Sequence, residues 1–382
     1  MDEKQGMTYE GAGLSYAGLD DFKKDAQASA SETNFFASRL GVSVLDWTRG
    51  ESVFVAKLGD QLIGFTVEGL GTKNEVERKF REALAIHEGM PVASHASFAN
   101  KYAQCCVAMI VNDKITLGVL PAVIGMHPAV ASDEWFKDEL RSRALIDGWQ
   151  HACELSGAVW GPGETPGLKD IIVPGTVCLS GAAWGVAPYG LFDPSTITDG
   201  DTISFLTSSG PHANGYTLYR KIADGLPNGY RSVMPNGQMY GDALLEPTHI
   251  YVKFIEECMK AGVQIRYGVN ITGHGWRKLM RAPGNFEYLI KKVPKLSTVF
   301  RFIQEQGNVS DRESFGNFNM DVGFAIYTPP SSVPLMKKVW REGNYPFDLI
   351  GNAGVIRASD RKSVNIEPLG FEPFTADELD MR

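Results

Sequence analysis

Two β-rich runs that lead into a glycine-bordered loop and a helix constrain this fold more than any other feature. Ser52–Leu58 and Gln61–Val67 are joined by a Gly-Asp pair, which has the chemistry of a hairpin turn. The segment EGLGTK follows at Glu68–Lys73, and Asn74 has the residue type of an N-cap for a charged helix. This succession of strands, loop and helix is typical of an α/β fold.

The rest of the chain continues to alternate helical and strand patterns. We expect further helices over residues 95–117 and 132–155 (with Ser132 as N-cap), from Tyr216 and from Glu246-Pro247, and further strands over residues 119–125, 158–160, 176–185, 202–207, 264–269 and 322–327. The first 40 residues and the charged tail after Ala358 are predicted to be irregular. A length of 382 residues exceeds what one core usually serves, so we expect an N-terminal extension over 1–40, an N-terminal domain over 41–195 and a C-terminal α/β domain over 196–382.

Composition narrows the class of protein. A net charge of -8 argues against sequence-independent binding to nucleic acid, which requires a basic surface. No run approaches the roughly 18 apolar residues of a membrane span, and the N-terminus lacks the apolar core of a secretory signal. The 5 cysteines form no CxxC pair, so reduced, buried thiols are expected rather than disulfides or zinc ligands. These features predict a cytoplasmic protein without membrane contact.

The loop at Glu68–Lys73 is the first candidate for chemistry. Gly69 and Gly71 allow backbone N–H groups to converge on an anion, the following helix N-terminus adds partial positive charge, and Lys73 adds a full one. Glu68 can offer a carboxylate oxygen to Mg²⁺. An ordinary glycine turn before a helix would have the same sequence, and the segment is not the Walker pattern.

Two acidic residues are weaker candidates. Asp113 follows an apolar helical run, where an acid must be paired or bound to metal if it is buried; an exposed position on the solvent side of the helix explains its spacing better. Glu164 lies in the loop GPGETP after a short strand, at the kind of strand end where α/β sites form. A structural turn with a solvated glutamate is an equal alternative there.

Two further loops combine glycine with polar residues. The segment SSGPHANG begins at Ser208 and precedes a helix, so its donors could bind a phosphate, and His212 could act as an acid or base near neutral pH. The segment NITGHG ends at Gly275 and offers Thr272 and His274. A lone histidine in such a loop is also common without any functional role.

Together these segments resemble the aminoimidazole ribonucleotide synthetase family, also called phosphoribosylformylglycinamidine cyclo-ligases. The resemblance extends over about residues 9–355 and is strongest in SSGPHANGYTL at Ser208–Leu218, beside the family's SSGPHSNGYSL. The other similar segments, in chain order, are YEGAG, GLGTK beside DGVGTK, VAMIVND beside VAMCVND, GPGET beside GGET, LLEPTHIYVK, NITGHG beside HITGGG and FNMDVGFAI beside FNMGVGMVI.

The resemblance implies a two-domain fold of the PurM-like superfamily, a homodimer that pairs through N-terminal sheets, and a specific reaction. The family closes the imidazole ring of formylglycinamidine ribonucleotide, a phosphoribosyl amidine, after ATP phosphorylates its formyl amide oxygen. It implies that Lys73 and Mg²⁺ on Glu68, Asp113 and Glu164 hold the ATP phosphates. The remaining implied site residues are Gly69, Gly71, Thr72, Ser208, Ser209 and Gly210 for the nucleotide, and His212, Ser209 and Asn214 for the reacting amide or substrate phosphate.

Several positions depart from the family's pattern. Glu68 replaces an aspartate, and Cys105 and Ser15 replace acids, although a thiol is a poor Mg²⁺ ligand. Pro162, His274 and Asp321 replace glycines. Two alternatives therefore stay open: an ATP-dependent kinase or synthetase of the same superfamily with another substrate, and a catalytically silent homodimeric binding protein.

Overall fold

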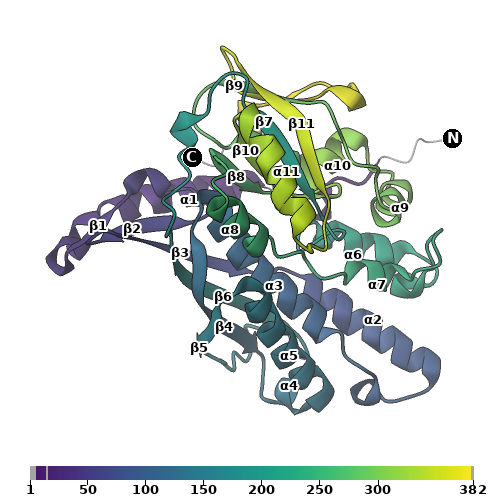
Figure 1. Cartoon of the computed structure of the whole chain (residues 1–382). Coiled ribbons are helices and arrows are strands. Elements are labelled where there is room, and N and C mark those ends of the chain that lie inside the picture. The colour runs from purple at the N-terminus through teal and green to yellow at the C-terminus, as the bar shows by residue number, and fades with distance from the viewer. Residues whose placement is uncertain (1–5, 14–15, 380–382) are drawn as a thin grey trace.

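Two mixed β-sheets, each with helices packed against it, make up the computed structural model of the chain (Figure 1). The structure describes residues 6–13 and 16–379. The helices are α1 (Tyr16–Ser31), α2 (Lys73–Glu88), α3 (Ala99–Lys114), α4 (Glu134–Lys137), α5 (Glu139–Ser156), α6 (Tyr216–Gly225), α7 (Tyr240–Leu244), α8 (Val252–Lys260), α9 (Thr298–Gly307), α10 (Asp311–Asn317) and α11 (Val333–Glu342). The strands are β1 (Val42–Val44), β2 (Phe54–Leu58), β3 (Gln61–Gly69), β4 (Leu120–Val130), β5 (Val159–Gly163), β6 (Val177–Val186), β7 (Thr202–Thr207), β8 (Tyr267–Asn270), β9 (Phe286–Ile290), β10 (Val322–Thr328), β11 (Leu349–Ala358), β12 (Ser363–Ile366) and β13 (Phe374–Thr375).

The first sheet has one covered face and one open face. Its strand order is β1-β2-β3-β6-β4-β5, antiparallel except between β4 and β5. Along β6, Leu179 and Ala183 are buried under α3 and α5, whereas Trp184 points outward and is 45% exposed. Gly181 lies on the covered face, where an added Cβ would approach the Ile110 side chain of α3 to 2.9 Å. This alternation is what a sheet with one packed face requires.

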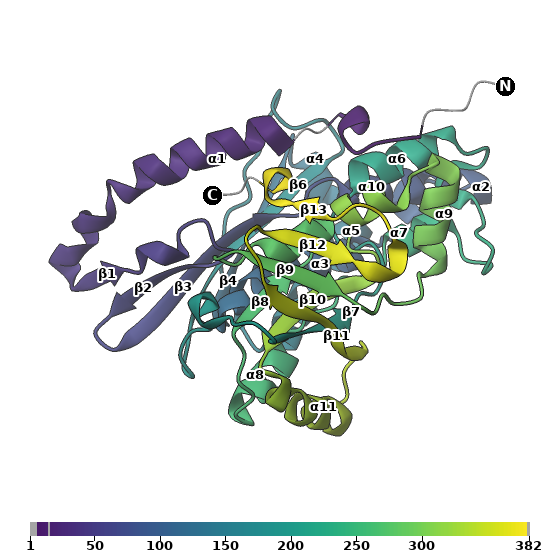
Figure 2. The same ribbon diagram turned by 90° about the horizontal axis from the view of Figure 1, so that it is seen from above.

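The second sheet is covered on both faces. Its order is β13-β12-β9-β11-β7-β10-β8, antiparallel except between β12 and β9. Figure 2 shows α8 and α11 on one side of it and α6, α9 and α10 on the other. Every residue of β10 is buried, as is every residue of β7 except the last. Such continuous burial explains why β10 is an almost unbroken apolar run in the sequence, whereas β7 alternates apolar residues with the hydrogen-bonded hydroxyls of Thr202 and Ser204.

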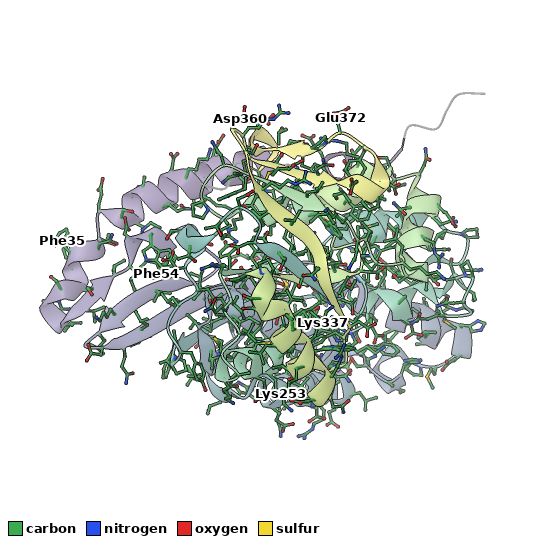
Figure 3. All side chains as sticks on the ribbon, turned by 45° about the horizontal axis from the view of Figure 1, so that its top comes forward. Phe35, Phe54, Lys253, Lys337, Asp360 and Glu372 are labelled. Carbon is green, nitrogen blue, oxygen red and sulfur yellow. The ribbon has the colours of Figure 1, made fainter. Side chains whose placement is uncertain are left out.

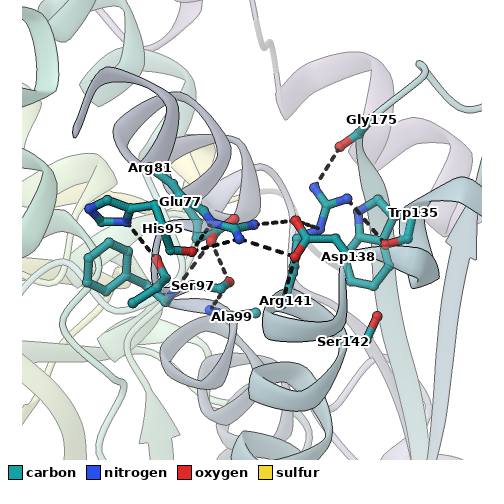
Figure 4. Close-up of polar contacts among 12 residues, drawn as sticks. Glu77, Arg81, His95, Ser97, Ala99, Trp135, Asp138, Arg141, Ser142 and Gly175 are labelled. Carbon is teal, nitrogen blue, oxygen red and sulfur yellow. Dashed lines mark hydrogen bonds and ion pairs between the residues drawn. The ribbon is translucent and has the colours of Figure 1, made fainter. Parts of the chain in front are cut away.

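A polar network ties the helices of the first half together (Figure 4). The guanidinium of Arg81 on α2 is 1% exposed and donates to the Asp138 carboxylate at 2.5 Å and to the His95 carbonyl. Asp138 also accepts from the Arg141 backbone N–H and so caps α5. Glu77 accepts from the Ser97 hydroxyl at 2.6 Å, just before α3. A buried charge paired in this way fixes the register of α2 against the starts of α3 and α5.

The strand predictions made from pattern alone are largely confirmed. β2 and β3 form the expected antiparallel hairpin, and β7 has the predicted bounds. β4, β6 and β10 begin within one residue of their predicted starts. The strand predicted over 264–269 is shorter in the structure and lies further along the chain, since β8 begins at Tyr267.

Three predicted helix starts are wrong for identifiable reasons. Asn74 lies inside α2, and its amide donates to the Val177 carbonyl at 2.6 Å instead of capping the helix. Asp138 rather than Ser132 caps the long helix, which a break after α4 separates from residue 132. The helix expected from Glu246-Pro247 begins only at Val252.

The delayed start of α8 has a specific cause in α3. Side chains of α3 take up the backbone groups of residues 246–251: Gln104 donates to the Thr248 carbonyl at 3.0 Å, and Asn112 donates to the His249 carbonyl at 2.8 Å. Asn112 also accepts from the Tyr251 N–H at 3.0 Å. A segment whose backbone is bonded to another helix cannot use the same groups to propagate its own.

Both chain ends hold more regular structure than predicted. The first 40 residues contain α1, and the tail adds β12 and β13 to the second sheet. The polar composition of the first 40 residues led to the prediction of an irregular segment, although the alanine and lysine residues of α1 favour a helix. Among the described residues, no helix combines the length and apolar character that crossing a bilayer requires.

The close approach of α5 to α3 can be tested at Gly148. An added Cβ there would lie 2.4 Å from the backbone of Asn100, so Gly148→Ala must push the helices apart. We expect it to lower the free energy of unfolding by about 2 kcal/mol, measured by urea denaturation. The control is Gly225→Ala at the end of α6, where nothing lies within 4 Å of an added Cβ. Equal stability of the two variants would contradict this packing.

Candidate active-site cleft

A cleft of about 670 Å³ opens where the first sheet meets the segment after β8. From the first half it is lined by β3 and the loop after it, including Glu68, Gly69 and Gly71, and by Asp113 on α3. From the second half it is lined by Ala213, Asn214, Thr272, Gly273, His274, Lys278 and Arg281. Residues from both halves of the chain therefore form a single concave site.

The acidic centre of the cleft is the pair Glu68 and Asp113. The pKa of Glu68 is raised to about 8, first by burial and then by the neighbouring charge of Asp113. Asn270 donates to one oxygen of Asp113 at 2.7 Å and fixes that carboxylate. Two facing carboxylates that cannot both ionise alone will share either a proton or a cation. The structure excludes the alternative that Asp113 lies exposed on the solvent side of its helix, because Asp113 is only 5% exposed.

Cationic side chains lie beside this pair. Lys278 is buried, and its ammonium donates to the Thr272 hydroxyl and to the Asn270 carbonyl. Burial lowers the pKa of Lys278, whereas Asp113 and Glu68 raise it. Arg281 donates to the Ser52 hydroxyl at 2.7 Å. Sequence reasoning missed both cations, although their position in the turn directly after the glycine-rich NITGHG segment was an available signal.

The loop from Ser208 to Gly215 separates two cavities. Asn214 lines the main cleft, whereas Ser208 and Ser209 line a second cavity of about 330 Å³. Between them, His212 is buried with a left-handed backbone at φ 57, and its Nε2 accepts the Ser209 N–H at 3.3 Å. Burial lowers the pKa of His212 well below its usual range, and His249 and Lys73 add to the effect. The ring is therefore neutral.

Comparison with known proteins identifies the family. No protein-family model matches the chain. The phosphoribosylformylglycinamidine cyclo-ligase of Methanococcus maripaludis strain C5 is 30% identical over 346 residues, covering 88% of this chain and 90% of that protein. The protein of the same name from Rippkaea orientalis is 32% identical over 281 residues, covering 70% and 74%. The chain belongs to the phosphoribosylformylglycinamidine cyclo-ligase family.

Solved structures show the same fold at low identity. The crystal structure of the HypE–HypF complex has a chain with TM-score 0.59 and 13% identity, covering 86% of this chain and 93% of that one. AaThiL complexed with AMPPCP and TMP has a TM-score of 0.54 at 14% identity, covering 86% and 91%. T. maritima PurL complexed with ATP has a TM-score of 0.52 at 12% identity, covering 85% and 46%. The predicted two-part α/β fold is confirmed.

Lys73 of this cyclo-ligase family member does not line the cleft. Its ammonium is fully buried and donates to the backbone carbonyls of His212 at 2.7 Å and Glu246 at 2.6 Å. It also lies 5.4 Å from the ring centre of Tyr216. Burial lowers the pKa of Lys73, and the adjacent Cys105 thiol opposes this. In this structure the lysine joins the two halves rather than facing a phosphate.

Other predicted residues also lie away from the carboxylate pair. Glu164 is exposed after β5, where its N–H donates to the Met126 carbonyl, and the structure does not bring it to the cleft. Thr72 is exposed at the start of α2. Cys105 is buried and its sulfur accepts the Thr248 N–H at 3.3 Å. Ser15 lies outside the described residues. Within the described part of the chain, no group of three or more histidine, cysteine or acidic side chains could hold a metal.

The joining role of Lys73 predicts a loss of stability on substitution. Lys73→Met keeps the length of the side chain but removes the buried ammonium that donates to the carbonyls of His212 and Glu246, so we expect the free energy of unfolding to fall by about 2 kcal/mol. Lys79→Met is the matched control, since Lys79 lies on the same helix and its ion pair with Asp224, at 3.0 Å, is at the surface. That variant should change stability by less than about 0.5 kcal/mol. Chemical denaturation measures both; a Lys73→Met protein as stable as the wild type would contradict the role.

Proposed function

We propose that this member of the cyclo-ligase family converts formylglycinamidine ribonucleotide and ATP to aminoimidazole ribonucleotide, ADP and phosphate. The match to the Methanococcus maripaludis cyclo-ligase carries the proposal, because it extends over 88% of the chain and 90% of that protein. The reaction forms a bond between the formyl amide oxygen and the γ-phosphorus of ATP, while the bond from that phosphorus to the β–γ bridging oxygen breaks and ADP leaves. An internal nitrogen of the amidine then attacks the activated carbon, the ring closes, and the oxygen leaves with the phosphate.

The cleft offers groups suited to a triphosphate and its cation. Mg²⁺ in nucleotide sites is usually held by one or two carboxylates together with phosphate oxygens and water. Glu68 and Asp113 fit that requirement, since they are two neighbouring carboxylates that line the cleft, and burial together with the charge of Asp113 raises the pKa of Glu68. When bound, Mg²⁺ would neutralise phosphate charge. Gly69 and Gly71 line the same wall and leave the backbone open to an anion.

Three roles follow for this chain's own residues. Lys278 and Arg281, beside the carboxylate pair, supply positive charge for phosphate oxygens. Asn214 holds its place in the cleft by donating to the Asn317 carbonyl at 2.7 Å. His212 is buried and neutral, so we assign it to supporting the loop that presents Asn214. Catalysis would then rest on positioning and charge neutralisation.

The test is release of ADP from ATP in the presence of formylglycinamidine ribonucleotide and Mg²⁺. Asp113→Asn keeps the shape of the side chain but removes half of the carboxylate pair, so we expect turnover to fall at least about 100-fold, as for loss of a few kcal/mol of charge stabilisation. Asp242→Asn is the control, because Asp242 lies on α7 at 3.8 Å from Lys101, away from the cleft lining.

The possible outcomes separate the alternatives. Turnover by the wild type and by Asp242→Asn, lost in Asp113→Asn, supports the proposal. Mg²⁺-dependent ATP binding without turnover of formylglycinamidine ribonucleotide would instead indicate a kinase or synthetase with another substrate. Absence of ATP binding to the wild type would indicate a binding protein.

We also propose that the open face of the first sheet binds a second copy of the chain. Cross-strand neighbours form an apolar rib across β2, β3, β6, β4 and β5, and its members in that order are Phe54, Phe65, Trp184, Val123 and Val159. Phe65 is 50% and Val159 is 64% exposed. A contiguous exposed apolar surface of this kind marks an association site in soluble proteins. Figure 3 shows Phe54 on this part of the molecule.

A charge at the centre of the apolar rib should separate the copies. We expect Trp184→Lys to shift the protein from dimer to monomer, because an unpaired ammonium would be buried on association. Ile171→Lys is the control, since Ile171 is 75% exposed but lies in a loop outside the rib. Sedimentation equilibrium measures both variants. A monomeric wild type, or a Trp184→Lys dimer as stable as the wild type, would refute the proposal.

A further inference from the structure

Helix α1 forms one wall of the cleft although it has few contacts with the rest of the protein. Lys23 and Gln27 of this helix line the cleft. The other described side chains of α1 are exposed or half-buried, and Phe22 is 74% exposed. Asp20 is the exception at 5% exposed, so the single buried side chain among those described in α1 is a carboxylate. An acid in that position must have a specific partner.

The partner of Asp20 is His274, 254 residues away in the sequence. The Asp20 carboxylate lies 3.2 Å from Nε2 of His274, and its other oxygen accepts from the Lys23 ammonium at 2.8 Å. His274 is 4% exposed. Burial lowers the pKa of His274 to about 4, so the ring is neutral. Its Nε2–H donates a hydrogen bond to the Asp20 carboxylate. The contact therefore links α1 directly to the loop that carries the cleft residues Thr272 and Gly273.

The backbone conformation of His274 is unusual for a residue that has a side chain. Its φ is +66, in the left-handed region that favours glycine. The family motif that NITGHG resembles has glycine at this position. Histidine tolerates this conformation better than most residues with a side chain, and non-glycine residues held in it are more frequent at functional sites.

We propose that the Asp20–His274 contact is a clamp that fixes α1 as a wall of the cleft, and that Lys23 and Gln27 on this wall contact the phosphates of the bound ligand. His274 is a positioning residue in this scheme. A second contact supports the same placement: Gly50 has φ +81, and an added Cβ there would lie 2.8 Å from the Gln27 amide oxygen. Lys23, Lys278 and Arg281 together give the cleft a cationic side suited to a polyphosphate. The identity of the ligand rests on the proposed function, whereas the clamp does not.

The clamp can be tested without any ligand by amide hydrogen exchange in residues 20–31. His274→Gly removes the ring and suits the backbone, so the protein should fold with an unchanged or higher Tm while exchange in α1 accelerates. Asp170→Gly is the matched control, since Asp170 has φ +65 in an exposed turn away from the cleft and should leave exchange in α1 unchanged. His274→Gln, whose terminal amide reaches the position of Nε2 and can still donate to Asp20, should restore slow exchange. Unchanged exchange in His274→Gly would overturn the clamp.

The ligand contacts are tested by titration with Mg²⁺–ATP. If loss of the clamp leaves α1 in place as a wall of the cleft in about one tenth of the molecules, the Kd of His274→Gly for Mg²⁺–ATP should rise about tenfold. The KM for ATP should rise similarly, with kcat nearly unchanged. Lys23→Met should weaken binding similarly. Binding by the wild type with no change in either variant would overturn the ligand contacts. If the wild type binds no Mg²⁺–ATP, the ligand contacts and the proposed function both fail, while the exchange result still decides the clamp.

Discussion

The buried ammonium of Lys73, between the carbonyls of His212 and Glu246, is the interaction on which the arrangement of the two halves depends. It sits at the first residue of α2, directly after the glycine loop of the cleft, and both of its acceptors belong to the second half. A buried cation with two acceptors is held strongly, because breaking either bond would leave one N–H group of the buried ammonium without an acceptor. The glycine loop and the loop around His212 are therefore fixed relative to each other before any ligand binds.

A second set of contacts extends this joint along α3. Gln104, Cys105 and Asn112 lie on α3 and bond the backbone of the irregular segment 246–251. Asp113, the next residue along, accepts from Asn270 of the second sheet. One helix thus bonds both to the connection before α8 and to the strand that leads into the cleft. The acidic pair is placed by the same contacts that join the sheets.

The sequence predicted those parts of the fold whose signal is local. Hairpin chemistry gave β2 and β3, an alternating pattern gave β7, and a buried apolar run gave β10. Local pattern failed where distant partners decide: α3 bonds the backbone of residues 246–251, and β12 pairs with β9 far along the chain. Helix α1 was missed because the polar composition of the first 40 residues was interpreted as loop, although its alanine and lysine residues favour a helix.

In the candidate site too, the sequence predicted some residues correctly and missed those whose position depends on distant parts of the chain. The resemblance brought together Glu68, Asp113 and Asn214, which do line one cleft. It could not show that Lys73 turns away into the protein, because direction depends on acceptors in another part of the chain. Lys278 and Arg281 were missed because they occupy a short turn whose proximity to Glu68 exists only in the folded protein.

Two aromatic residues belong to more than one surface of this molecule. Phe54 and Phe65 are members of the apolar rib and also line the cleft. If a second copy of the chain covers the rib, as we propose, it would contact two residues that line the cleft. Dilution of the protein would then alter ligand binding without a change in any residue of the acidic pair, because dissociation of the copies would uncover these residues.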